Sequence, residues 1–189
     1  MPLYEFTLII EGPDLGSEGH LDALFEIGCD DATFGSRDNV QYGAFDREAD
    51  SLPIALTSAI TQVETAVPEA RIVRVEPDEF VSLSVIAERT KRTTESIRQL
   101  YKGLRGPGGF PSPISWIDQK NKVWRWSDVA EWFEQALGEA VGSHEAETVA
   151  ALNGVLETRR HLQRIGEDER AAVASFVSED EDLHSLLAV

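Results

Sequence analysis

The sequence has little of what would place it outside the cell or in a membrane. Its 189 residues include a single cysteine, Cys29, which cannot form a disulfide within the chain. No apolar run approaches the roughly 20 residues needed to cross a bilayer. The first residues also lack the basic start and long apolar stretch of a signal peptide. We therefore expect a cytoplasmic protein with no membrane partner.

Residues that carry catalysis or bind metals are also scarce. The four histidines are scattered, without HxxxH pairs or a cysteine at metal-ligand spacing: His20, His144, His161 and His184. The run "GPGG" lacks the Lys-Ser/Thr of a phosphate-binding loop. Four aspartates near a predicted hairpin could hold a divalent cation, although a solvated acidic loop is the commoner outcome: Asp30, Asp31, Asp38 and Asp46. Cys29 beside two of them should be an inert thiol. We expect no catalytic residue, no metal and no cofactor, and hence not an enzyme.

Charge is distributed unevenly along the chain. The formal net charge is -17, which opposes contact with a phosphate backbone. Residues 80–136, however, carry 9 basic and 6 acidic side chains, including every lysine, whereas residues 1–79 carry 4 basic and 17 acidic ones. A basic segment between acidic ones is compatible with DNA binding by the middle of the chain.

The first 78 residues alternate between strand-like and helix-like patterns. Residues 3–11 are rich in aromatic and β-branched side chains, and residues 18–27 place apolar side chains at helical spacing. The strand-like runs "DATFGS" and "VQYGAF" flank a polar turn. A helix capped by Ser51 and a last strand, "ARIVRVE", follow. The fold class is α+β, and the order β-α-β-β-α-β predicts a ferredoxin-like sandwich over residues 1–78, for dimerisation or sensing.

Beyond Gly138 the sequence becomes acidic and rich in alanine. Apolar spacing predicts one helix over residues 144–165 and a shorter one at "DERAAVASFV", within a helical region at 138–178. These helices either pack on the other domains or form a self-association pair. Residues 179–189 read as a mobile acidic tail.

Two short amphipathic helices are predicted in the basic segment. Ser82 is the expected N-cap of the first, and Thr93 or Thr94 of the second. The turn between them, "TKRT", contains no glycine, so a left-handed Lys91 would cost about 1 kcal/mol. Polar side chains of the second helix face outward together and suit contacts to base edges and phosphates: Thr94, Glu95, Arg98, Gln99 and Lys102.

Four segments follow one another along the basic part of the chain: "SLSVIAERTKRTTESIRQLYKG", "RGPGGFPSPI", "KVWRW" and "SDVAEWF". Together they resemble the winged helix-turn-helix of MerR-type and excisionase-like DNA-binding proteins. The positions that match the family pattern are Phe110, Pro111, Pro113, Arg125, Trp126, Asp128, Val129 and Trp132. The resemblance covers about residues 80–136 and implies a winged helix-turn-helix domain at 80–137.

The segment after the helix pair predicts the wing. "ISWID" and "VWRW" flank "QKNK" and should pair as a hairpin whose tip presents Lys120, Asn121 and Lys122 to phosphate. The Gly-rich run before it, "RGPGGFPSP", is expected to be mobile without DNA. Ser127 should cap a final helix, and the four tryptophans should mainly pack in the core.

These patterns predict a sequence-specific transcriptional regulator that binds double-stranded DNA as a homodimer. Thr94, Arg98 and Gln99 would contact bases. The remaining predicted DNA-binding residues, most of them phosphate contacts, are Thr93, Lys102, Arg105, Lys120, Asn121 and Lys122. One alternative is an adaptor or antitoxin-like protein whose acidic amino- or carboxy-terminal regions bind a protein partner. Another is a small-molecule sensor with its pocket in the sandwich.

Overall fold

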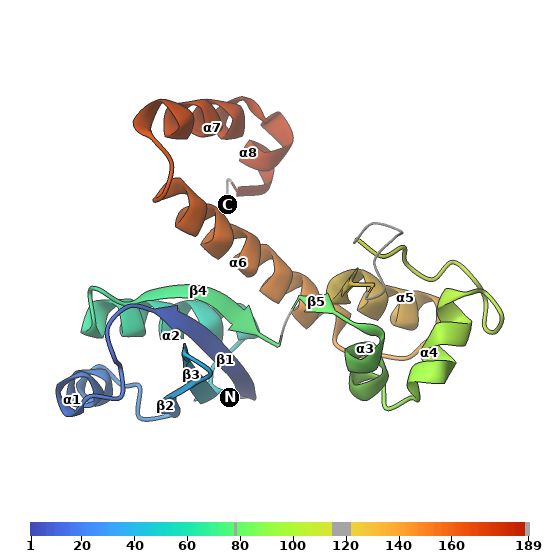
Figure 1. The fold of residues 1–189 in the computed structure, drawn as a ribbon, viewed down its shortest axis with the longest axis horizontal. Helices are drawn as coiled ribbons and strands as arrows, with labels where there is room; N and C mark the ends of the chain where they lie inside the picture. The colour runs from blue at the N-terminus through green and yellow to red at the C-terminus, as the bar shows by residue number, and fades with distance from the viewer. Residues whose placement is uncertain (78, 115–121, 188–189) are drawn as a thin grey trace.

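The computed structural model describes residues 1–77, 79–114 and 122–187. Helices and an antiparallel sheet are both present, which confirms the α+β class. Figure 1 shows the sheet with α1 and α2 at the left and a separate group of helices, α3, α4 and α5, at the right. The long helix α6 runs from the junction of the two groups past β4 to α7 and α8 at the top. Among the described residues, no helix is both long enough and apolar enough to span a bilayer.

The amino-terminal unit is built on a four-stranded sheet in the order β2-β3-β1-β4, with every neighbouring pair antiparallel. Its strands are β1 (Leu3–Glu11), β2 (Ala32–Arg37), β3 (Val40–Glu48) and β4 (Arg71–Glu76). Asp38 and Asn39 both have positive φ, at 52° and 63°, and form a two-residue turn between β2 and β3. The predicted hairpin is confirmed by this pairing.

Two helices cover one face of this sheet: α1 (Glu18–Glu26) and α2 (Leu52–Ala66). Phe6, Leu8 and Ile10 alternate with more exposed residues along β1, so their side chains share the face toward the helices. They pack with Leu24 of α1 and Leu56 of α2 in one core. Ser51 is the N-cap of α2, as predicted, although its side chain makes no capping bond.

The middle unit has its own core. Its elements are β5 (Phe80–Val81), α3 (Leu83–Arg89), α4 (Thr94–Tyr101), β6 (Trp124–Arg125) and α5 (Trp126–Leu137). Ser82 and Thr93 cap α3 and α4 as predicted, with hydroxyls that accept from Val85 N at 3.4 Å and Ser96 N at 3.1 Å. The prediction for Ser127 was wrong. The helix α5 begins at Trp126, two residues earlier than a cap at Ser127 would give, and Ser127 is buried inside its first turn.

The second strand of the predicted wing has a partner that the sequence did not predict. β6 pairs with β5, a two-residue strand too short to be predicted from alternation. The segment expected to pair with "VWRW" is "ISWID", and its first residue forms a backbone hydrogen bond from Ile114 N to Val123 O at 2.9 Å. The rest of that segment and the tip residues Lys120 and Asn121 lie outside the described residues.

The carboxy-terminal helices are α6 (Ser143–Leu162), α7 (Glu167–Glu179) and α8 (Glu181–Leu187). Helix α6 contributes Val149 and Leu156 to the core of the sheet unit, while Ala146 packs against the core of the middle unit. By contrast, α7 buries none of its residues. The predicted acidic tail contains a helix that the sequence did not predict, α8 at Glu181–Leu187.

Side chains from α2 and α6 cover the outer edge of β4. Asn153 accepts a hydrogen bond from Val75 N at 2.7 Å and donates one to Val75 O at 3.0 Å. Ile72 N donates to Glu64 Oε1 at 2.9 Å, and Ile72 O accepts from Arg159 Nη2 at 2.7 Å. Backbone groups that would otherwise be open to another strand are thus satisfied within the chain.

Candidate nucleic-acid interface

The turn between α3 and α4 sets how the two helices cross. Arg92 N donates to Ala87 O at 2.8 Å, and Lys91 N donates to Glu88 O at 3.0 Å. This is the Schellman pattern, which requires a left-handed residue after the helix cap. Lys91 occupies that position with a φ of 53°, the left-handed conformation expected to cost about 1 kcal/mol at this residue. The exposed lysine is therefore held at the junction of the two helices.

One side of α4 packs inward and the other carries the predicted contacts. Ile97 and Leu100 are buried, whereas Arg98 and Lys102 are exposed and Gln99 is half-buried. Thr93 is exposed and Thr94 half-buried at the amino end of the helix. The predicted outward face is therefore present on α4.

Arg98 is not free on this face. Its Nη1 donates to Glu95 Oε2 at 2.5 Å, an i,i+3 pair in which both side chains are largely exposed. Such pairs contribute only about 0.2–0.5 kcal/mol, so Arg98 can exchange Glu95 for another acceptor at low cost.

Lys122 lies against the carboxyl end of α4. Its Nζ donates to the Tyr101 hydroxyl at 2.5 Å. The ammonium lies beyond the hydroxyl, because it is 5.0 Å from the ring centroid and half that from the oxygen. Tyr101 also packs edge-on against Phe110 and Trp124, so its ring lies on the packed side of α4. The structure thus places Lys122 at the carboxyl end of α4, and Lys120 and Asn121 lie outside the described residues.

The Gly-rich run before the wing is fixed to the core, contrary to the expectation that it is mobile. Trp132 Nε1 donates to Gly108 O and Trp124 Nε1 to Pro111 O, each at 3.0 Å. Phe110 packs edge-on against Trp132 with their ring centroids 4.9 Å apart. The sequence predicted packing tryptophans, and their indole N–H groups explain why this segment is ordered.

Several cations of the basic segment are engaged by carboxylates. Arg92 pairs with Glu139 at 2.5 Å, and Arg125 pairs with Glu79. Within the described residues, Lys102 and Arg105 form no ion pair and are exposed. With Lys122, they leave three cations near the carboxyl end of α4 for contact with an anion.

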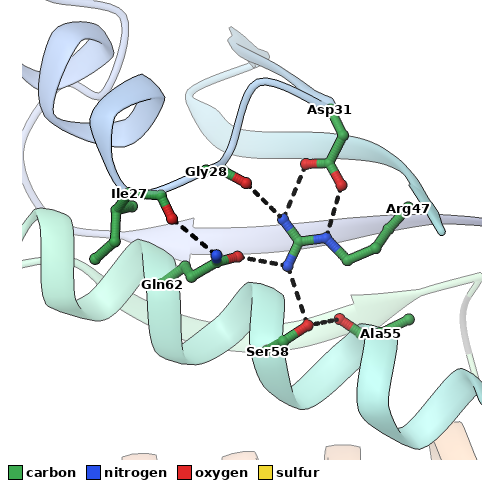
Figure 2. Close-up of polar contacts among 7 residues, drawn as sticks. All are labelled: Ile27, Gly28, Asp31, Arg47, Ala55, Ser58 and Gln62. Atoms are coloured by element: carbon green, nitrogen blue, oxygen red, sulfur yellow. Dashed lines mark hydrogen bonds and ion pairs between the residues drawn. The ribbon is translucent and has the colours of Figure 1, made fainter. Parts of the chain in front are cut away.

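The most buried polar cluster lies in the sheet unit, around Arg47 (Figure 2). Its guanidinium donates to both Asp31 oxygens, at 2.7 and 2.9 Å, and to Gln62 Oε1 at 2.6 Å. Ser58 and the Gly28 carbonyl accept the remaining bonds, so all five N–H groups are used. The cluster joins β3, α2 and the loop before β2, and the guanidinium has no N–H group left for a ligand.

The aspartates considered for a cation do not form a site. Asp31 is engaged by Arg47, and no group of three or more metal-ligating side chains gathers anywhere in the described ranges. Burial raises the pKa of the Cys29 thiol, which keeps it protonated near neutral pH.

No protein-family model matches the chain, and no similar curated protein or solved structure was found.

Proposed function

We propose that the chain binds double-stranded DNA through a winged helix-turn-helix, with α4 in the major groove. The observation that carries the proposal is the polar face of α4, which has exposed Arg98 and Lys102 and is followed by exposed Arg105. Lys122, bonded to the Tyr101 hydroxyl, adds a cation near the carboxyl end of the helix. A groove-reading helix needs polar side chains for bases and flanking cations for phosphates, and this surface carries both.

Because the rest of the protein is acidic, affinity for DNA depends on the surface around α4. With a net charge of -17, the chain gains little from non-specific attraction to DNA. Affinity must therefore come from Lys102, Arg105 and Lys122 at close range and from base contacts by Thr94, Arg98 and Gln99.

We interpret the amino-terminal unit as a ferredoxin-like sandwich, supported by its strand order β2-β3-β1-β4 and its two helices. Because one recognition helix reads only a few base pairs, we propose a homodimer on a two-fold repeated site. Sedimentation of the full chain with and without its DNA site would test the dimer.

The test begins by selecting bound DNA from a random pool with the full chain at two salt concentrations, followed by affinity measurements on the selected site. Arg98→Ala should weaken binding about 5- to 150-fold and relax sequence preference, since it removes a base contact. Lys122→Ala should lower the slope of log affinity against log salt by about 1. Arg37→Ala removes an exposed cation of the β2–β3 hairpin in the other unit and is the matched control. Selection that enriches no sequence, or equal losses in all three variants, would refute the proposal.

A second candidate function, binding of a protein partner by the carboxy-terminal region, is supported by α7. Its Val173, Phe176 and Val177 lie at helical spacing, and all three are exposed, Phe176 by 67%. A photo-crosslinking residue at position 176, compared with one at the exposed Ala171, would test it. A single protein crosslinked only from position 176 supports this function, and equal or no crosslinking contradicts it.

A further inference from the structure

A cavity of about 530 Å³ lies where the sheet unit, the linker and the middle unit meet. The start of β1, the linker at Pro77, the first residue of α5 and the first turns of α6 all contribute to its wall. It is distinct from the proposed DNA-binding face, because no residue of α4 lines it. Its size is in the range of pockets that hold small organic ligands.

Much of the wall is apolar. Tyr4, Leu52, Trp126 and Val149 contribute side chains from four different elements. An apolar or aromatic body placed here would bury surface against both cores at once.

The charged groups at the cavity are mainly carboxylates: Glu5, Glu79 and Glu145, against one lining guanidinium, Arg89. Glu79 is paired with Arg125, and the Arg89 guanidinium stacks over Trp126 at 5.0 Å from the ring centroid. The side chains of Glu5 and Glu145 form no ion pair or hydrogen bond with any other described residue.

The strand register places a second carboxylate beside Glu5. Glu5 of β1 lies directly opposite Asp46 of β3, and both side chains are exposed. An adjoining hollow of about 410 Å³ shares Glu5, Phe6 and Pro77 with the cavity and includes Asp46. No described cation pairs with either carboxylate, so this side of the cavity is acidic.

We propose that this cavity binds a small organic cation with an apolar body, its ammonium near Glu5 and Glu145 and its body against Tyr4, Trp126 and Val149. An anion of the same shape is repelled, and a neutral molecule gains only the apolar contacts.

The test uses three probes with one ring system: biphenyl-4-ylmethylammonium, biphenyl-4-ylmethanol and biphenyl-4-carboxylate. Calorimetric titration of the full chain without DNA should show the ammonium binding about fivefold tighter than the alcohol, with the carboxylate weakest. The assay contains no DNA, so its outcome is independent of the proposed function.

Two double variants separate a local effect from the general charge of the protein. Glu5→Gln with Glu145→Gln should reduce the affinity for the ammonium to that for the alcohol and leave the alcohol unchanged. Glu18→Gln with Glu26→Gln makes the same charge change on the exposed surface of α1 and should alter nothing. Leu3→Trp, at a lining residue that is 57% exposed, should weaken all three probes by filling the cavity.

Equal affinities for the three probes, equal losses in the two double variants, or no binding of the ammonium at about 1 mM would overturn the proposal.

Discussion

Replacing Asn153 by leucine removes two hydrogen bonds. Because the site is buried, this should destabilise the protein far more than the loss of two hydrogen bonds at an exposed site would. The side chain is 7% exposed and bonds both backbone groups of Val75 on the outer edge of β4. Leucine is similar in size and has a higher helix propensity, but it leaves a buried N–H and a buried C=O without partners. Each unsatisfied group costs about 1–3 kcal/mol, and burial of leucine offsets part of this. We expect a net loss of about 2–4 kcal/mol, or a fall in Tm of roughly 5–15 °C.

The assay is urea unfolding followed by circular dichroism, together with hydrogen exchange at the Val75 amide. In Asn153→Leu this amide should exchange faster relative to global unfolding than in the parent. Asn153→Asp keeps the acceptor for Val75 N but loses the donor for Val75 O and adds a buried charge, so it should be the less stable variant at neutral pH. If Asn153→Leu unfolds within about 0.5 kcal/mol of the parent, the edge bonds do not stabilise β4 and the reasoning fails.

The remaining predictions concern stability measured by urea unfolding at several pH values. Arg47→Met should cost about 3–5 kcal/mol, because it leaves the Asp31 carboxylate and several buried acceptors unpaired, and a loss below about 1 kcal/mol would contradict the network. Gly154→Ala should stabilise by about 0.5–1 kcal/mol, since this glycine is inside α6 with open space where a Cβ would lie; no gain would show that the helix backbone is strained there. Burial raises the pKa of Glu79, and its partner Arg125 partly opposes this shift. Protonated Glu79 therefore contributes its whole stabilisation below the pKa of an unfolded carboxyl group. This stabilisation is lost as pH rises through the pKa of Glu79 in the folded protein. Glu79→Gln should therefore lose less stability than the parent as pH rises from about 4 to neutrality, and parallel curves would refute this. The hydrogen bond from Arg160 lowers the pKa of Glu11. Above pH 5, Glu11→Gln should therefore be less stable than the parent by less than about 1 kcal/mol, and this difference in stability should vanish as pH falls through the pKa of Glu11 in the folded protein. A difference in stability that persists in acid would count against this ion pair.

Elements with strong local patterns could be predicted from sequence. The alternation along β1, the three- and four-residue spacing in α2 and the caps Ser82 and Thr93 each depend on neighbours a few residues away. The pairing of β5 with β6 depends instead on residues more than 40 positions apart, and two residues are too few to show a period.

The buried polar residues could not be predicted from the sequence, for a related reason. Arg47 lies in "AFDREAD", which reads as the solvated end of a strand, yet its acceptors come from α2 and from the loop before β2. Asn153 has no local signal at all in a helix whose other buried residues are apolar. Such side chains are identified only when the segments that satisfy them are placed.

In the candidate interface too, local features could be predicted and long-range contacts could not. The outward face of α4 follows from helical spacing, so Arg98, Gln99 and Lys102 could be predicted. The contact between Lys122 and Tyr101 joins residues 21 positions apart in the sequence, and no periodicity defines it.

The bonds that complete the edge of β4 also affect how the protein is made. Val75 and Asn153 are separated by 78 residues, so a nascent chain leaving the ribosome holds its first four strands with one side unpaired for roughly 4 to 16 s. A fragment ending near residue 78 or residue 137 would remain in that state, and we expect such fragments to accumulate in inclusion bodies. Expression plasmids for the separate units should therefore encode α6 together with the sheet.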